Sequence, residues 1–207
     1  MNLRSLLRSR ALAIGAAALL GVVLIVATTW VLLAPTTRSM AGGEALVGGP
    51  FTLTDQHGAE VTEQDFAGRY MLIYFGYTYC PDVCPMSLAN MTQAVDLLPP
   101  DEAEQVVPVF ITVDPERDTV EQLAEYAPLF HPRLVALTGS PEATKAAAQA
   151  YRAYFAKAGD DDSDAYLMDH SSFIYLMGPD GKYVRHFAHN AAPEEIATAI
   201  EAVIAAS

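Results

Sequence analysis

Basic residues are scarce in this 207-residue chain, which holds 12 lysines and arginines against 25 aspartates and glutamates. Four of the basic residues lie within the first 38 positions. Residues 39–207 therefore carry 8 basic against 25 acidic residues, a net charge of −17. A field of that sign repels phosphate backbones, so we expect no nucleic-acid partner. The acidity either keeps the protein soluble or attracts metal cations or a cationic partner.

Long hydrophobic runs are absent except for residues 11–33, where 19 of 23 residues are hydrophobic and none is charged. One run excludes a polytopic membrane protein, and the remaining composition excludes a disordered chain. A helix of that length spans about 34 Å, enough to cross a bilayer. The run is longer than the apolar core of a cleavable signal peptide, which favours an uncleaved anchor over cleavage near residues 39–41.

Arginine is concentrated before this run, with three arginines ahead of it and one after it. This asymmetry predicts a cytoplasmic N-terminus at residues 1–10, a transmembrane anchor at 11–33 and a tether at 34–50. We expect a single-pass protein of the inner (cytoplasmic) membrane whose soluble domain, residues 51–207, lies in the periplasm. The alternative is the mitochondrial inner membrane, with the domain in the intermembrane space.

Internal repeats are absent from the soluble part, and strands and helices are expected to alternate along it. Thr119 and Ser140 are predicted to cap the second and third helices, and residues 178–181 to form a hairpin turn. The order predicts an α/β sheet with helices on both faces. Strands are expected at 51–54, 69–77, 106–113, 134–137, 172–177 and 182–187, and helices at 87–98, 119–130, 141–155 and from 193.

Only two cysteines occur, Cys80 and Cys84, directly after a predicted buried strand and at the start of a predicted helix. Their spacing can place both sulfurs on one face of a helical turn, and the helix amino terminus favours thiolate. A purely structural disulfide would constrain little of the unfolded chain, so a redox pair or a metal chelate fits better. Asp82 is expected to cap the helix, with an outer-ligand or partner contact as the alternative.

Two thiolates select Cu(I), and imidazole suits both oxidation states of copper, so a third ligand is sought among the five histidines. His57, His131 and His186 lie in a turn, a loop and a hairpin strand, where surface or packing roles are expected. His170 directly precedes a strand, and in a thioredoxin-type sheet that loop lies across from the cysteine loop. We predict His170 as the third ligand, with His189 next. Structural zinc normally has four protein ligands, and only three are evident.

The side chains around these residues have structural interpretations. Tyr77 and Tyr79 are expected to pack or line the site, and Met86 and Met168 are weaker thioether candidates. The segment 114–118 is expected to form a turn and a helix start, with Arg117 paired locally.

The sequence YFGYTYCPDVCP, residues 74–85, resembles the signature of the Sco/SenC family, membrane-anchored copper chaperones that assist cytochrome c oxidase assembly. The resemblance implies a thioredoxin-like fold after the transmembrane helix. It also implies copper, as Cu(I) or Cu(II), bound by Cys80, Cys84 and His170 and delivered to the dinuclear copper site of oxidase subunit II. Other periplasmic copper chaperones are expected as further partners. Similar motifs follow in the family's order at 113–119, 130–133, 137–141, 169–172 and 178–181.

The implied activity is that of a metallochaperone and not of an enzyme. The alternative is a thiol–disulfide oxidoreductase that keeps the client cysteines reduced, with Cys80 and Cys84 as a redox-active pair able to form a disulfide. Two features count against an oxidoreductase as the sole role. Three residues separate the cysteines instead of the usual two, and the cis-proline that thioredoxin-like reductases place before the strand near Ser171 is absent from this sequence. A peroxidase of the peroxiredoxin type is not expected, because those enzymes carry threonine three residues before the reactive cysteine, where this chain has Tyr77.

Overall fold

The structure is a computed structural model that describes residues 47–159 and 166–207. The predicted N-terminal segment and anchor, and residues 34–46 of the tether, lie outside the described residues. Within the part of the chain that the structure describes, no helix is both long enough and apolar enough to span a membrane.

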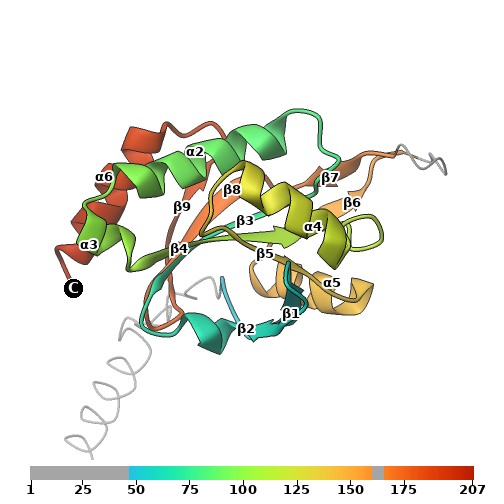
Figure 1. Cartoon of the computed structure of the whole chain (residues 1–207), viewed down its shortest axis with the longest axis horizontal. Helices are drawn as coiled ribbons and strands as arrows, with labels where there is room; N and C mark the ends of the chain where they lie inside the picture. Colours follow the sequence, from blue (N-terminus) through green and yellow to red (C-terminus); the bar gives the residue numbers. More distant parts are fainter. Residues whose placement is uncertain (1–46, 160–165) are drawn as a thin grey trace, which may run out of the picture. The chain divides into compact units, whose positions relative to one another are not determined.

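A mixed seven-stranded sheet forms the centre of the domain (Figure 1). Its middle strands, β3 (Tyr70–Gly76) and β4 (Val106–Thr112), run parallel and are buried along their whole length. Such continuous apolar sequences are typical of strands that are covered on both faces. Outward from β4 lie β5 (Val135–Thr138), β1 (Thr52–Asp55) and β2 (Glu60–Thr62), and outward from β3 lie β8 (Phe173–Met177) and β9 (Tyr183–Ala188).

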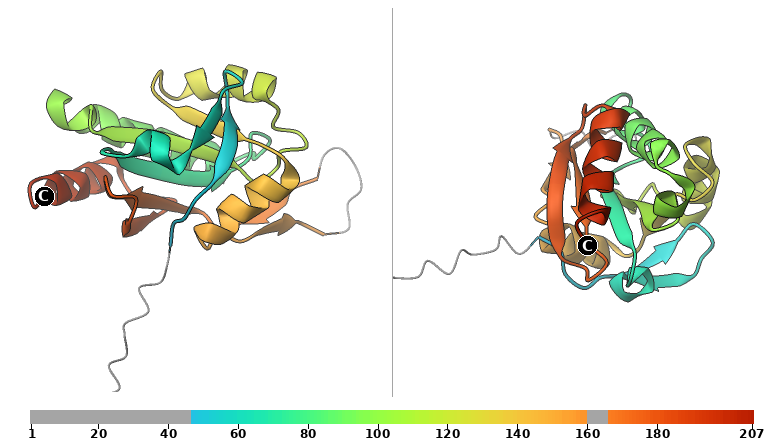
Figure 2. Two further views of the ribbon diagram at one scale, coloured as in Figure 1. Left: turned by 90° about the horizontal axis from the view of Figure 1, so that it is seen from below. Right: turned by 90° about the vertical axis from the view of Figure 1, so that its left-hand side faces the viewer.

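Helices cover both faces of this sheet, as the sequence predicted. α2 (Val83–Leu97) and α6 (Pro193–Ile204) pack against each other on one face, and α5 (Pro141–Ala150) lies on the other (Figures 1 and 2). Side chains of β3 alternate between the two faces. Tyr74 points towards α2, and Phe75 meets Tyr151 at the end of α5, with 5.5 Å between ring centroids. This is a thioredoxin-like arrangement.

Several elements differ from the prediction for local reasons. α2 begins four residues early, so that Cys84 lies inside its first turn. The second helix is correctly capped by Thr119, but α4 (Val120–Tyr126) then gives way to a 3-10 turn, η2 (Ala127–Leu129), which contains a proline. The 3-10 turn η1 (Glu63–Phe66) and the short helix α3 (Pro100–Ala103) were not predicted.

The third helix was predicted to reach Phe155 and ends at Ala150 instead. Ser140 does cap its start, accepting the Ala143 N–H at 3.1 Å. Arg152 then adopts a left-handed φ of 57°, which stops the helix. Beyond it, β6 (Phe155–Lys157) pairs with β7 (Met168–His170) in a separate two-stranded sheet. Both strands were missed because their pairing is not encoded by local periodicity.

Candidate metal centre

The two cysteines lie where the central strand β3 passes into helix α2. Cys84 is the second residue of the helix and is fully buried, whereas Cys80 lies in the preceding loop and is partly exposed. First-turn N–H groups of a helix have no partner within the helix. Here the Cys84 N–H donates to Sγ of Cys80 at 3.4 Å. The helix start therefore stabilises negative charge on the Cys80 sulfur, as the sequence predicted.

Glycine at position 76 makes room for the buried sulfur. A Cβ on Gly76 would lie 2.9 Å from Sγ of Cys84 and 2.8 Å from Cε1 of Tyr74. Both distances are shorter than real Cβ contacts, so the sulfur occupies space that only glycine leaves open at the end of β3.

His170, the last residue of β7, brings its imidazole to this sulfur. Its Nε2 lies 3.3 Å from Sγ of Cys84, across 86 positions of sequence. Its Nδ1 lies 3.2 Å from the Ser171 carbonyl oxygen, which can only accept, so the ring proton belongs on Nδ1. Nε2 is then left with its lone pair towards the sulfurs. The rings of Tyr74 and Tyr77 meet the imidazole edge-on at 6.0 and 5.9 Å, which fixes its orientation.

Cys80, Cys84 and His170 together form a compact donor set. Their ligand atoms all lie within 4.8 Å of one another, and no other such group of histidine, cysteine and acidic side chains occurs among residues 47–159 and 166–207. Two sulfurs and an imidazole nitrogen, without a carboxylate, suit copper or zinc and not calcium or magnesium. The structure thus brings together the three residues that the sequence singled out.

The two thiols differ in acidity because each acts on the other. The hydrogen bond with Cys84 lowers the pKa of Cys80 below its ordinary value, and bonds from backbone N–H groups of the helix start add to this against the effect of burial. The same bond with Cys80, together with burial, raises the pKa of Cys84. At neutral pH the accessible sulfur is therefore the thiolate and the buried sulfur keeps its proton.

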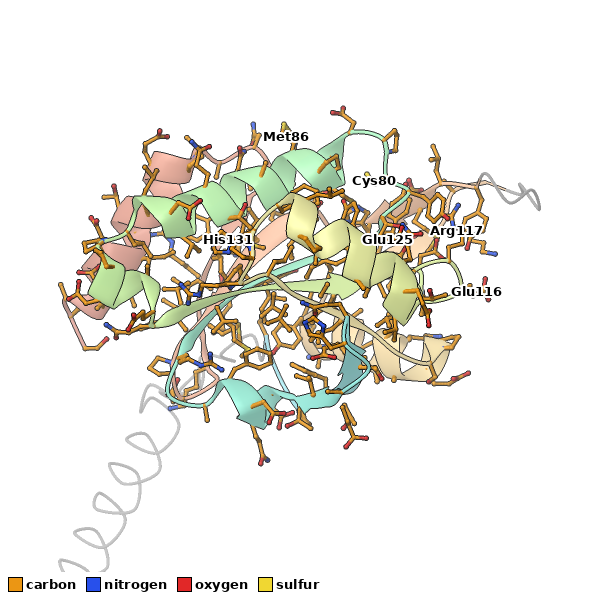
Figure 3. The ribbon with its side chains drawn as sticks, viewed as in Figure 1. Cys80, Met86, Glu116, Arg117, Glu125 and His131 are labelled. Carbon is orange, nitrogen blue, oxygen red and sulfur yellow. The ribbon has the colours of Figure 1, made fainter. Side chains whose placement is uncertain are left out.

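The remaining histidines lie elsewhere. His131 is buried beside α2, where Nε2 contacts Asp96 at 3.2 Å and Nδ1 accepts the Arg133 N–H at 3.0 Å, which confirms a packing role. His57 and His186 are exposed. His189 is partly exposed and lies outside the donor set. Figure 3 shows His131 further along α2 than Cys80.

Other neighbours of the cysteines also differ in part from expectation. Asp82 occupies the N-cap position of α2, but its side chain makes no capping hydrogen bond, so the capping prediction is wrong. Met86 is exposed on α2, and Met168 packs against the core. Tyr77 packs on His170, and Tyr79 lies under the guanidinium of Arg117, 4.8 Å from its ring centroid.

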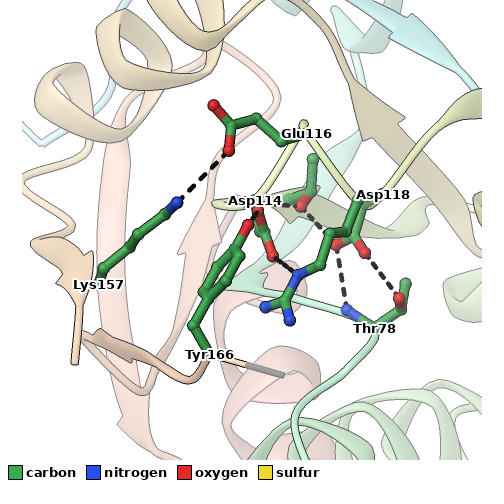
Figure 4. A network of polar contacts seen from close by, with 8 residues as sticks. Thr78, Asp114, Glu116, Asp118, Lys157 and Tyr166 are labelled. Carbon is green, nitrogen blue, oxygen red and sulfur yellow. Dashed lines mark hydrogen bonds and ion pairs between the residues drawn. The ribbon is translucent and has the colours of Figure 1, made fainter. Parts of the chain in front are cut away.

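Asp118 anchors the cysteine loop and was missed by the sequence analysis. This fully buried carboxylate accepts hydrogen bonds from the N–H and hydroxyl of Thr78, at 3.0 and 2.6 Å, and from the hydroxyl of Thr112 at 2.6 Å (Figure 4). Burial raises the pKa of Asp118, and these bonds partly offset it. Its place in the loop after β4 gave no signal, because only folding brings Thr78 and Thr112 around it.

Arg117 extends this support beyond the local pairing that the sequence predicted. It does pair with Asp114, three residues before it. Its guanidinium also stacks on Tyr166, 3.6 Å from the ring centroid, and the Tyr166 hydroxyl donates to Asp114 at 2.6 Å (Figure 4). The 114–118 loop therefore joins the cysteine loop to the start of the segment that carries His170.

Comparison with known proteins gives matches over most of the chain. The model of a family described as SCO1/SenC matches residues 39–205. "Protein SCO1 homolog 1, mitochondrial" of Arabidopsis thaliana is 47% identical over 150 residues, covering 72% of this chain and 45% of the relative. "Protein SCO1 homolog, mitochondrial" of Homo sapiens is 44% identical over 159 residues, covering 76% and 53%. This chain thus spans about half the length of these curated relatives.

Solved structures are similar to this chain as well. Arabidopsis thaliana ScoI with copper bound is 42% identical with a TM-score of 0.70, covering 78% of this chain and 99% of that one. Bradyrhizobium japonicum ScoI with copper bound is 42% identical with a TM-score of 0.69, covering 75% and 98%. BsSco is 27% identical with a TM-score of 0.62, covering 78% of this chain and 95% of that one. It is described as a member of the Sco family of cytochrome c oxidase assembly proteins in which a disulfide switch was identified.

Proposed function

This chain belongs to the SCO1/SenC family, and from that premise we propose that it is a copper carrier of cytochrome c oxidase assembly. It binds copper through Cys80, Cys84 and His170 and delivers it to the dinuclear copper site of oxidase subunit II. The observation that carries the proposal is the donor set itself, three ligand atoms within 4.8 Å of one another. Related structures with copper bound support the identity of the metal.

The unequal burial of the ligands suits a carrier. Cys84 is fully buried, whereas Cys80 and His170 are partly exposed. An incoming client protein therefore reaches Cys80 and His170 before it reaches Cys84. Thiolates of the client displace these two in turn, and Cys84 releases the copper last. Copper binding requires Cys84 to lose its proton, so loading releases protons and becomes stronger as pH rises.

A membrane location fits a client that is itself bound to a membrane. We infer that residues 11–33 anchor the chain in the inner membrane and leave the copper-binding domain in the periplasm. The arginines around this run support the orientation. Other periplasmic copper chaperones are the proposed source of the metal, and the net negative charge of residues 39–207 favours cationic partners and metal cations.

Anaerobic copper titration of the reduced chain tests the ligand set. The wild-type chain should bind one copper, and His170→Ala should weaken that binding by at least tenfold. His57→Ala is the matched control, because that ring is exposed and outside the donor set. Undiminished affinity in His170→Ala would exclude His170 as a ligand. Transfer to an apo copper domain of oxidase subunit II then tests delivery, which fails if the loaded chain keeps its copper.

Thiol–disulfide exchange with the client is the second candidate, favoured by the opposite pKa shifts of the two thiols. The Cys80 thiolate attacks a client disulfide and forms a mixed disulfide. The Cys84 thiol, losing its proton, then attacks Cys80, which releases the client dithiol and leaves a Cys80–Cys84 disulfide. Rapid reduction of the client that is unaffected by His170→Ala would favour this role over copper transfer.

A further inference from the structure

The hydroxyl of Tyr74 is a buried polar group without a partner next to the donor set. Tyr74 lies on β3 with its side chain fully buried. Among the described residues, no group forms a well-aligned hydrogen bond with its hydroxyl. Such a group lowers stability, because it has given up its bonds to water. Phenylalanine would fill the same space without that loss, so the hydroxyl calls for an explanation.

Acceptors for this hydroxyl lie in the first turns of α2. Tyr74 and Cys84 flank the space left by Gly76, where a Cβ would approach both side chains closely. Ser87 lies three residues after Cys84 on the same buried face of α2. Ser87 uses its own proton on the Val83 carbonyl at 2.7 Å, so its oxygen is free only to accept. Cys84 and Ser87 are therefore the two acceptors to separate.

The strengths of the two acceptors favour the sulfur as the partner. A tyrosine hydroxyl ordinarily carries its proton at neutral pH and can donate. A thiol is a weak acceptor, but a hydrogen bond to an ionised group is about twice as strong as a neutral one. The hydroxyl thus gains a good partner only when Cys84 becomes a thiolate ligand.

We propose that Tyr74 is a positioning residue, whose hydroxyl donates a hydrogen bond to Sγ of Cys84 once that sulfur holds a metal ion. This inference rests on the proposed copper function. A hydrogen bond to a ligand sulfur draws charge away from the metal, as second-shell contacts do at other metal sites. Tyr74 therefore favours Cu(I), the state in which a sulfur-rich carrier site holds its cargo most stably.

Tyr74→Phe in the full-length chain tests this role by spectroscopy and electrochemistry. The Cu(II)–thiolate charge-transfer band should move to lower energy. The ratio of Cu(I) to Cu(II) affinity should fall roughly tenfold, which lowers the midpoint potential by about 59 mV for a one-electron couple. One copper should still bind. Tyr151→Phe is the matched control, since Tyr151 is also a buried tyrosine but lies at the end of α5, where its ring packs on Phe75 on the face of the sheet opposite α2.

Ser87→Ala separates the two acceptors, and its band and potential should match those of the wild type. An unchanged band and potential in Tyr74→Phe would overturn the proposal, as would Ser87→Ala reproducing the Tyr74→Phe shift. A wild-type chain that binds no copper would refute the proposed copper function but would leave the proposed role of Tyr74 to be tested with another metal. The same variants loaded with Cd(II), whose thiolate band reports on the sulfur alone, would then decide on Tyr74.

Discussion

Gly76→Ala is the substitution that tests most directly how the buried sulfur is held. The new methyl group would lie 2.8 Å from Cε1 of Tyr74, 2.9 Å from Sγ of Cys84 and 3.1 Å from Cε2 of Phe110. All three neighbours are fully buried, so none can move into solvent. Overpacking of a core typically costs about 1–3 kcal/mol, whereas removing glycine from a strand returns about 0.5–1 kcal/mol.

The expected net loss of stability is therefore about 1 kcal/mol, within a range of roughly 0–2.5 kcal/mol, measured by urea unfolding of the reduced, metal-free chain. Copper affinity should fall as well, because the new methyl group is expected to push the Cys84 sulfur out of its position. Gly139→Ala is the control. Its methyl group would meet the end of Leu53 at 3.0 Å and Cβ of Ala143 at 3.6 Å, and no atom of the donor set is among its nearest neighbours. It should cost less stability and leave copper affinity unchanged. Wild-type stability and copper affinity in Gly76→Ala would refute the reasoning.

Three further predictions follow from acidity and capping. In the reduced, metal-free chain Cys80 should react with iodoacetamide well before Cys84 at about pH 6, because its pKa is lowered; mass spectrometry showing Cys84 modified first would contradict this. Burial raises the pKa of Asp118 above its ordinary value of 3.8, so its contribution to stability is complete below that value and is lost as pH rises through the folded-state pKa. Asp118→Asn should remove this slope from urea unfolding measured across pH, and parallel profiles would count against it. Ser140→Ala should cost about 1 kcal/mol in the same assay with copper binding intact, since Ser140 caps α5, which lies on the face of the sheet opposite α2 (Figure 1).

Local sequence signals predicted the parts of the fold that depend on nearby residues. The buried strands β3 and β4, the caps at Thr119 and Ser140 and the hairpin turn at 178–181 all have a local cause. β6 and β7 have none, because three residues on each strand pair across a long connection. Helical periodicity carried the prediction through to Phe155, although the left-handed Arg152 ends the helix before it.

The candidate site shows the same division. Cys80 and Cys84 were evident from spacing, and His170 from its place before a strand, and the structure groups all three. Their roles as ligands stay a prediction. Asp118 and Tyr74 could not be identified in advance, because their importance depends on which groups folding places beside them. Neither a buried carboxylate nor a tyrosine in an apolar strand is informative without its neighbours.

The contact between His170 and Cys84 joins residues 86 positions apart, so it exists only in the folded chain. Unfolding leaves a flexible dithiol and removes the imidazole, and metal held by all three groups must lose one of its donors. Binding energy of that metal is then also folding energy, adding about 1.4 kcal/mol for each tenfold excess of free metal over the dissociation constant. A metal-loaded chain is consequently harder to unfold and to digest with a protease than a metal-free one, so its lifetime depends on whether it holds metal.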